Sequence, residues 1–404
     1  MTGPVTRSGP APVAERATVA VVTLLDPAAR VSAPMWRRTE RLCTRIQDLL
    51  TAAARQAPGG PLDAALRGLR NDPLDRRLQR ELSDAVTTAL HQDAGLAAEL
   101  DAHIRVFDDR NRIVLDRGPR HESRPADGTP TAREIAAAAA AEPRDTTGHW
   151  DVTVVLDFRD TTSGDRLRNA VATAAALRDQ SLDPARHRLV VVEQDDHARH
   201  RDLIAPLADL YVHAPHGGPY NRSWAHNVGA VATRGHDRRL LFLDADVLPD
   251  RTFLERLLDR IDTVGARALL PHESLHYLDE SSSETALRAR LFSTERTVDP
   301  DGLHGYRLVT NRGGCILVDS DVFHDIHGFD ERYEGWGDED NEFFDHLRRH
   351  TPVHMSDEVL LHLHHPRPRM EDDHGRRPNE WLLGATEGRP TAIGDPQRYA
   401  SLPL

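Results

Sequence analysis

The chain has 404 residues, a formal net charge of −13 and only two cysteines. This length allows two or three domains, and the negative charge argues against a general nucleic-acid-binding surface. Cys43 and Cys315 are too few for a disulfide framework, which is typical of a protein of the reducing cytoplasm. No apolar run reaches the ~18 residues that a membrane span needs, so we expect a cytoplasmic protein without a membrane span.

The first 117 residues are predicted to precede the main domain as a small, mainly helical region. Residues 1–35 are expected to form a flexible tail and a strand at the apolar run Val19 to Leu25, because no basic segment of a signal peptide precedes that run. Apolar residues recur every three or four positions in the accessory region at 36–117, which is typical of amphipathic helices. Residues 104–116 are expected to form a hairpin around Asp109, Arg110 and Asn111.

A change of pattern marks the second half of the chain. Residues 118–149 are polar and rich in proline and glycine, as in a linker, with a short helix inside or after it. Residues 150–370 then alternate strands with helices, which predicts an open, mostly parallel α/β sheet with helices on both faces. Residues 371–404 would form a C-terminal flap or tail. The expected strands are the near-continuous apolar runs 152–160, 187–196, 239–250 and 312–323.

Acidic residues stand at the predicted carboxyl ends of three strands. Ligands of such sheets bind beyond these ends. The acids are Asp157 and Asp160, Glu193 and Asp195, and Asp244 and Asp246.

The pair Asp244 and Asp246 follows the apolar strand of "RLLFLDADVLPD". Two carboxylates at this spacing make half of a site for a hard divalent cation, which prefers oxygen ligands and often shares phosphate oxygens. The alternative is a strand-ending turn, in which aspartate is common.

Three histidines follow the last apolar run, in "VLLHLHHPRP". Imidazole is a good ligand for manganese, iron or zinc. In a straight strand His362 and His364 would share a face, whereas a bend would bring His362 and His365 together. The residue pattern leaves both arrangements open.

The stretch "GFDERYEGWGDEDNEFFDHL" at 328–347 places Trp336 between Gly335 and Gly337. The acids after it would complement the dipole of an ordinary surface helix. That interpretation leaves the glycines and the tryptophan unexplained, and these favour a binding site on a loop. Arg222 and Asn227 lie on the polar side of a helix predicted at 220–235, a position where such residues usually meet water.

Taken together and in this order, four segments resemble the inverting glycosyltransferases of the GT-A fold. They resemble the C-terminal region of the β-1,4-galactosyltransferases and bacterial family-2 relatives, including chondroitin-polymerase-type domains. Residues 1–145 lie outside the resemblance. The segments are "YNRSWAHNVGA", "LLFLDADVLPD", "RGGCILVDSDVFHDIHGFDERYEGWGDEDNEFF" and "HLHHP".

The resemblance implies a Rossmann-like GT-A domain that moves a sugar from a nucleotide-sugar donor, expected to be a UDP-sugar, to an acceptor hydroxyl with inversion. Asp246, His362 and His365 match the metal ligands, which favours the bent arrangement. The metal would be Mn²⁺, or alternatively Mg²⁺. The galactosyltransferases have methionine in place of His362, so the metal preference stays open.

The other implied roles belong to the substrates and the base. Asp340 matches the catalytic base, with Glu339 beside it, and Trp336 matches the ring that borders both sugar sites. Inverting transfer needs a carboxylate to take the proton of the attacking hydroxyl, and a cation to neutralise the leaving diphosphate. The remaining expected substrate-binding residues are Asp157, Arg159, Glu193, Arg222, Asn227, Asp244, Gly314 and Gly337.

The implied partners are the donor and an acceptor that is a small metabolite, a peptide or a glycan. The helical region would serve acceptor binding or self-association into a homo-oligomer. One alternative is a carbohydrate- or nucleotide-binding protein that kept the fold without the reaction, but the base, the aspartate pair and the histidines are all present. A sugar-nucleotide nucleotidyltransferase would have a glycine-rich basic loop after its first strand, whereas residues 154–169 contain one glycine. A metal-dependent hydrolase is favoured still less.

Overall fold

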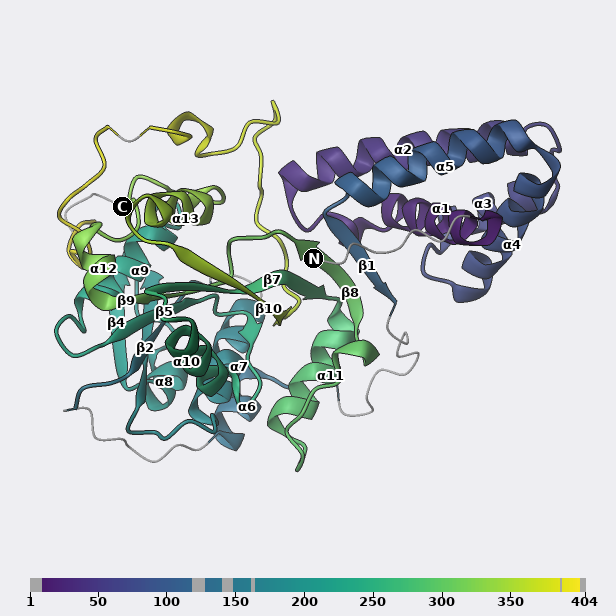
Figure 1. The fold of residues 1–404 in the computed structure, drawn as a ribbon. Helices are drawn as coiled ribbons and strands as arrows, with labels where there is room; N and C mark the ends of the chain where they lie inside the picture. Colours follow the sequence, from purple (N-terminus) through teal and green to yellow (C-terminus); the bar gives the residue numbers. More distant parts are fainter. Residues whose placement is uncertain (1–8, 118–127, 140–147, 161–163, 386, 400–404) are drawn as a thin grey trace. The chain divides into compact units, whose positions relative to one another are not determined.

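The structure is a computed structural model that describes residues 9–117, 128–139, 148–160, 164–385 and 387–399 (Figure 1). The chain divides into two compact units, one of Met1–Asp116 with Gly305–Val309 and one of Arg117–His304 with Thr310–Leu404. Parts of the predicted tails and of the predicted linker at 118–149 lie outside the described residues. None of the helices in these ranges is long and apolar enough to cross a membrane.

The first unit is mainly helical, as predicted. Its core is formed by buried aliphatic side chains and Phe107. Asn111 ends the last helix, and Val309 of strand β8 donates its N–H to the carbonyl of Arg112 over 3.0 Å. The elements are α1 (Pro10–Leu25), a 3₁₀ turn (Pro27–Ala29), α2 (Ala33–Ala54), α3 (Pro61–Asn71), α4 (Arg76–Gln92), α5 (Ala94–Arg110) and β1 (Ile113–Arg117), with β8 (His304–Val309) beside β1.

The expected strand from Val19 to Leu25 is wrong, because these residues lie in helix α1. Every residue from Ala17 to Thr23 is buried. A helix buried all around satisfies its backbone hydrogen bonds internally and can carry β-branched residues on every face. Tertiary packing therefore overrides the local strand preference of this run.

The expected hairpin at 104–116 is also wrong. Helix α5 continues to Arg110, since Leu100, Ile104 and Phe107 repeat at helical spacing and are all buried. The turn comes at Asn111, whose side-chain amide donates to the carbonyl of Ile113 over 2.6 Å.

The second unit alternates strands and helices. The strands are β2 (Val152–Phe158), β3 (His187–Asp195), β4 (Leu210–Pro215), β5 (Arg239–Leu243), β6 (Val247–Leu248), β7 (Ala268–Leu278), β9 (Cys315–Asp319) and β10 (Val353–His362). The helices are α6 (Ala132–Ala138), α7 (Asp165–Arg178), α8 (Arg201–Ile204), α9 (Arg222–Val231), α10 (Phe253–Val264), α11 (Glu280–Leu291), α12 (Ser320–Asp325) and α13 (Glu339–His350), with 3₁₀ turns at Ala205–Leu207, Pro300–Gly302 and Glu380–Leu382.

The strands form a mixed, mostly parallel sheet in the order β7-β9-β5-β2-β3-β4. Strand β2 runs parallel to β3 and β5, and β4 runs parallel to β3. Strand β9 runs antiparallel to both its neighbours. Strand β10 extends the sheet by pairing parallel with β7 and, at its end, antiparallel with β6. The predicted fold class is confirmed.

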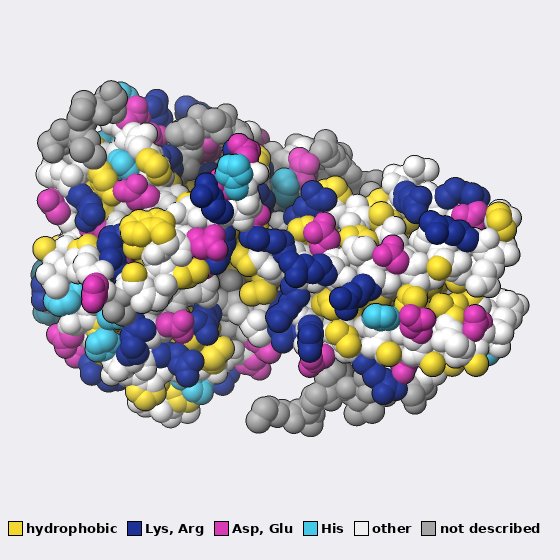
Figure 2. Space-filling model, turned by 90° about the horizontal axis from the view of Figure 1, so that it is seen from above, with side chains coloured by type: hydrophobic (Ala, Val, Ile, Leu, Met, Phe, Trp, Pro, Cys, Tyr) yellow, Lys and Arg dark blue, Asp and Glu magenta, His cyan; other side chains and the backbone are white. Residues whose placement is uncertain are grey.

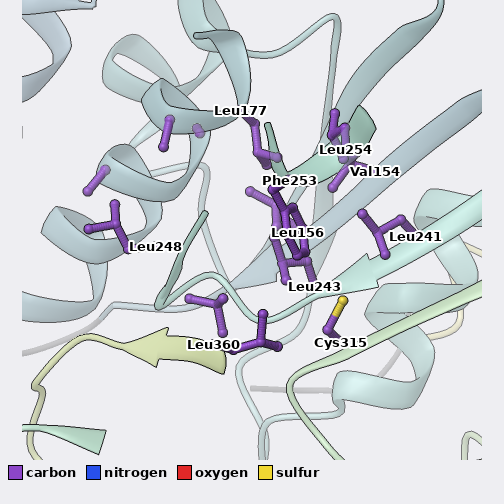
Figure 3. Close-up of a cluster of buried hydrophobic side chains, with 14 of the residues drawn as sticks. Val154, Leu156, Leu177, Leu241, Leu243, Leu248, Phe253, Leu254, Cys315 and Leu360 are labelled. Carbon is purple, nitrogen blue, oxygen red and sulfur yellow. The ribbon is translucent and has the colours of Figure 1, made fainter. Parts of the chain in front are cut away.

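Helices cover both faces of this sheet (Figure 1). Val154 and Leu156 of β2 face a core shared with α7 and α10, which includes Leu177 and Phe253 (Figure 3). The intervening Val155 faces a second core shared with α9, α12 and α13. The alternation along one strand therefore buries both faces, as the near-continuous apolar pattern predicts.

Charged side chains of both signs are spread over the surface. On the face drawn in Figure 2, Lys and Arg side chains gather in several groups, with Asp and Glu side chains scattered among uncharged ones. Cys43 and Cys315 are both free and buried.

Helix α9 packs unusually close to the sheet at Gly229. A Cβ atom at this position would lie 2.5 Å from Cγ1 of Val155 and 3.1 Å from Cγ2 of Val192. Both valines belong to central strands that cannot move aside. We expect Gly229→Ala to lower the free energy of unfolding by about 1–3 kcal/mol, because overpacking outweighs the helix preference of alanine.

Urea unfolding measures this effect. Gly148→Ala is the matched control, because the added methyl would meet no atom closer than 3.9 Å. We expect a change within about 0.5 kcal/mol for the control. Equal effects of the two substitutions would contradict the packing argument.

Candidate functional site

The site begins where strand β5 ends. Asp244 and Asp246 follow Leu243 directly. The N–H of Asp244 donates to the carbonyl of Gly314 over 2.9 Å, and the carbonyl of Asp246 accepts from the N–H of Leu363 over 2.8 Å. These two backbone bonds tie the aspartate pair to the start of β9 and to the end of β10. The pair therefore lies at a carboxyl end of the sheet, where ligands bind in this architecture.

Asp246 meets two histidines at the end of β10. Nε2 of His362 lies 3.3 Å from one carboxylate oxygen of Asp246, and Nε2 of His365 lies 3.0 Å from the other. One ligand atom from each of the three residues falls within 4.8 Å of the others. The chain bends after His362, so that His365 and not His364 joins the cluster. His364 is exposed.

The hydrogen bonds of the two histidines define which ring nitrogen faces the aspartate. Nδ1 of His362 lies 3.0 Å from the carbonyl of Leu363, and Nδ1 of His365 lies 2.8 Å from the carbonyl of Pro366. A carbonyl only accepts, so each neutral ring carries its proton on Nδ1 and turns a lone pair on Nε2 toward Asp246. Burial lowers the pKa of His362 to about 3, which keeps that ring neutral.

Two lone pairs and a carboxylate converge on one small volume. Oδ1 of Asp246 is buried and makes no hydrogen bond within the described part of the chain. Oxygen and imidazole donors together suit Mn²⁺ and related divalent cations, and backbone acceptors on the outer ring nitrogens are the usual support of such ligands. The residues present therefore fit a divalent cation.

A second cluster is centred on Arg222, the first residue of α9. Its guanidinium lies 3.0 Å from Asp340 and 3.4 Å from Glu339, at the start of α13. It also forms an ion pair with Asp244, and its Nε lies 4.0 Å from Asp157 at the end of β2. One mostly buried guanidinium thus joins carboxylates from two strand ends and one helix start.

The cluster around Arg222 has more negative than positive groups, and this excess changes the pKa values of its members. Burial and, to a lesser degree, the adjacent Asp340 raise the pKa of Glu339 to about 7, against the opposing attraction of Arg222. Burial also raises the pKa of Asp244, against the opposing attraction of Arg222. The four acidic neighbours raise the pKa of Arg222 well above its usual value despite its burial, so it stays charged. The cluster therefore favours additional protons or a cation.

The loop around Trp336 is built from left-handed backbone. Gly335 has φ +76° and Gly337 has φ +107°, values that favour glycine. The N–H of Gly335 donates to the carbonyl of Tyr220 over 2.7 Å, and the carbonyl of Gly337 accepts from the side chain of Asn379 over 2.9 Å. Trp336 is half-buried between these two anchored glycines.

The carboxylate of Asp340 packs closely against the backbone of Gly313, two residues before strand β9. A Cβ atom on Gly313 would lie 2.2 Å from Oδ2 of Asp340, so any side chain there would displace this carboxylate. The next residue, Gly314, has φ +97° and closely approaches Leu275. These two glycines allow α13 to bring its first carboxylates next to the end of β5.

Three of the predicted substrate-binding residues, Glu193, Arg159 and Asn227, bond to the backbone of neighbouring loops. Both oxygens of Glu193 are engaged, one by the backbone N–H groups of Arg199 and His200 and the other by the hydroxyl of Tyr211. Arg159 donates to the carbonyls of residues 194, 216 and 218. The side-chain amide of Asn227 donates to the carbonyl of residue 329 and accepts from its N–H, both over 2.9 Å. In this structure these side chains therefore stabilise the conformation of loops around the site.

Asp157 lies at the edge of the Arg222 cluster and is itself buried. It accepts a hydrogen bond from the hydroxyl of Tyr220, and its other oxygen lies 2.7 Å from Nε2 of His226. Neither partner is among the residues predicted from the sequence. His226 stands four positions after Arg222, a spacing that puts two residues on one helix face and could have identified it.

The comparisons with known proteins concern the segment that carries these features. Residues 304–356 match the family described as the N-terminal domain of galactosyltransferase. The matched range contains Gly314, Trp336, Gly337, Glu339 and Asp340. The predicted resemblance to the galactosyltransferases is confirmed. The aspartate pair of β5 precedes the matched range, and the two clustered histidines follow it.

Curated relatives and solved structures also match part of the chain. The pre-mycofactocin glycosyltransferases of two Mycobacterium tuberculosis strains, CDC 1551 / Oshkosh and ATCC 25618 / H37Rv, are 28% identical over 279 residues, which cover 63% of this chain and 55% of theirs. The chain therefore spans about half the length of these curated relatives. Two crystal structures of S. aureus TarS cover 53% of this chain, and 60% and 37% of their own chains, each with a TM-score of 0.38 and with identities of 12% and 14%.

The histidine cluster makes a direct prediction about metal binding. His365→Ala removes one of the two imidazoles, and we expect the affinity for Mn²⁺ to fall by at least about 10-fold. Titration of Mn²⁺ followed by electron paramagnetic resonance measures it without any substrate. His364→Ala is the matched control, since it removes a neighbouring imidazole that lies outside the cluster, and its affinity should match the wild type. Equal losses in both variants would contradict the assignment.

The raised pKa of Glu339 predicts how stability depends on pH. Between about pH 4.5 and 7 the folded protein holds a proton at Glu339 that the unfolded chain releases. Relative to Glu339→Gln, the wild type should therefore be most stable below about pH 4.5 and should lose this advantage as the pH rises through about 7. Urea unfolding of both proteins across this range measures the difference. A difference that does not change with pH would show that Glu339 titrates normally.

Proposed function

We propose that the chain is a metal-dependent, inverting glycosyltransferase that moves a sugar from a nucleotide sugar to an acceptor hydroxyl. The donor would be a UDP-sugar, and the acceptor a small metabolite, a peptide or a glycan. The names of the relatives from Mycobacterium tuberculosis support transfer of a sugar to an acceptor. The match of residues 304–356 to a galactosyltransferase domain supports the same chemistry.

One observation carries the proposal. Arg222 contacts both Asp244 and Asp340, and Asp246 stands two residues after Asp244 beside His362 and His365. Arg222 therefore links the candidate base, Asp340, to the aspartate pair that contributes to the candidate metal site. Transfer requires this proximity, because the attacked carbon is bonded to the phosphate that leaves.

The metal site would act on the donor. Asp246, His362 and His365 would hold a divalent cation, which neutralises the departing nucleoside diphosphate when it is bound. Asp244 would lie next to the ribose or to the water shell of the cation. The guanidinium of Arg222 pairs with Asp244. This ion pair would hold Asp244 in place where the diphosphate of the donor binds.

The start of α13 would act on the acceptor. Asp340, in the first turn of α13, would remove the proton of the acceptor hydroxyl as its oxygen attacks the anomeric carbon. Glu339, whose pKa is raised to about 7 by burial, would retain a proton near neutral pH and could donate a hydrogen bond to the acceptor. Trp336 would offer a flat apolar face on which a sugar ring stacks.

The test uses nucleotide release from a panel of nucleotide sugars with Mn²⁺, with and without a chelator. In this assay we expect Asp340→Asn to lower turnover by roughly 10²- to 10⁴-fold, because asparagine keeps the shape of the side chain but cannot accept the proton. Donor affinity should change little, since other residues hold the nucleotide.

Glu339→Gln is the control for this substitution. It should lower turnover less than Asp340→Asn or act through acceptor affinity. Normal turnover of Asp340→Asn together with an inactive Glu339→Gln would exchange the two roles. If the wild type binds nucleotide sugars but turns over none of the panel, the proposal gives way to a binding protein of the same fold. Release of pyrophosphate from a nucleoside triphosphate would indicate a nucleotidyltransferase.

A further inference from the structure

The C-terminal segment after His365 returns to the loop that carries Trp336. Asn379 is buried, and its side chain donates to the carbonyl of Gly337 over 2.9 Å and accepts from the N–H of Glu334 over 3.2 Å. Both ends of the Gly-Trp-Gly turn are thus bonded to one side chain from the C-terminal segment. Further along, the N–H of Gly394 donates to the buried carboxylate of Glu331 over 2.7 Å.

Asp338 is the strained point of this loop. It has φ +72°, a left-handed conformation that L-residues with a side chain rarely adopt, and it directly precedes the first residue of α13. A residue at this position normally has extended backbone, and its side chain accepts a hydrogen bond from the first turn of the helix. In the described structure Asp338 makes no such bond.

The carboxylate of Asp338 pairs instead with Arg377. Nη1 of Arg377 donates to both carboxylate oxygens, and the side chains are only 18% and 7% exposed for Arg377 and Asp338. A distant, sheltered ion pair therefore replaces the local helix cap. The residues whose direction depends on this turn are Glu339 and Asp340.

We propose that Arg377 and Asn379 are positioning residues that hold the turn at Gly337 and Asp338, and thereby aim Asp340 at the acceptor site beside Arg222. The inference rests on the proposed function for the role of Asp340 as a base. Its structural half, that Arg377 holds Asp338 in a left-handed conformation, stands without it. The C-terminal segment is then part of the catalytic machinery, and Arg377 acts through Asp338 without touching the substrates.

Asp338→Gly provides a discriminating background, because glycine adopts the left-handed conformation without a partner. We expect Arg377→Ala to lower turnover by roughly 10- to 100-fold, as a small misplacement of a catalytic group does, with the KM for donor within about twofold of wild type. In the Asp338→Gly background, Arg377→Ala should lower turnover by no more than about 2-fold, because the ion pair no longer matters. A full loss in that background would overturn the proposal and indicate direct contact of Arg377 with a substrate.

Arg376→Ala is the matched control. Arg376 is the neighbouring arginine, its side chain is 69% exposed, and it pairs with Asp372 within the C-terminal segment itself. Its turnover should equal that of the wild type. A loss equal to that of Arg377→Ala would overturn the proposal, because it would show a general effect of charge on this segment. Thermal unfolding of each variant identifies any that fail to fold, and for these the exchange experiment below uses Arg377→Lys.

Hydrogen–deuterium exchange tests the structural half without any enzymatic activity. Backbone amides of residues 334–344 should exchange faster in Arg377→Ala than in wild type or Arg376→Ala, and adding Asp338→Gly should slow them again. Unchanged exchange in Arg377→Ala would overturn the inference even if turnover falls. If the wild type transfers no sugar, the proposed function fails, but the exchange result still decides whether Arg377 holds this turn.

Discussion

The guanidinium of Arg222 is the interaction on which the arrangement of the site depends. It contacts acidic side chains from the ends of β2 and β5 and from the start of α13. Without a cation among them, these carboxylates would repel one another in surroundings of low polarity. Their attraction to one arginine holds three separate parts of the chain together at the carboxyl edge of the sheet.

Arg222 brings one positive charge to four acidic side chains, so the region has an excess of negative charge. Proteins relieve such an excess by taking up protons or by binding a cation. The raised proton affinity of Glu339 and Asp244 is the first. The neighbouring group of Asp246, His362 and His365 offers ligand atoms for the second. The excess negative charge therefore attracts protons and cations to this part of the sheet.

The close packing of helix α9 against the sheet positions Arg222, the first residue of this helix. Gly229 lets the helix approach β2 and β3 closely, and Asn227 bonds both backbone groups of Phe329 in the loop that leads to Trp336. The same helix therefore connects the sheet, Arg222 and the loop. Asn227, Glu193 and Arg159 resemble ligand-binding residues in type and position, but their polar atoms are used to fix the backbone around the site.

Local sequence patterns determined the alternating α/β domain, the aspartate pair at a strand end, the glycine-flanked tryptophan and the acidic helix start. Each depends on periodicity or on the conformational freedom of glycine within a few residues. The choice between His364 and His365 depended on the antiparallel pairing of β6 with the end of β10, which lies more than a hundred positions away. The helix at Val19 to Leu25 depended on burial by other helices, which overrode a local strand preference. Likewise, only tertiary structure decided that Arg377 pairs with Asp338 and that Glu193 is occupied by backbone groups. A polar residue's partners are set by what the fold brings next to it, and neighbours in sequence do not specify that.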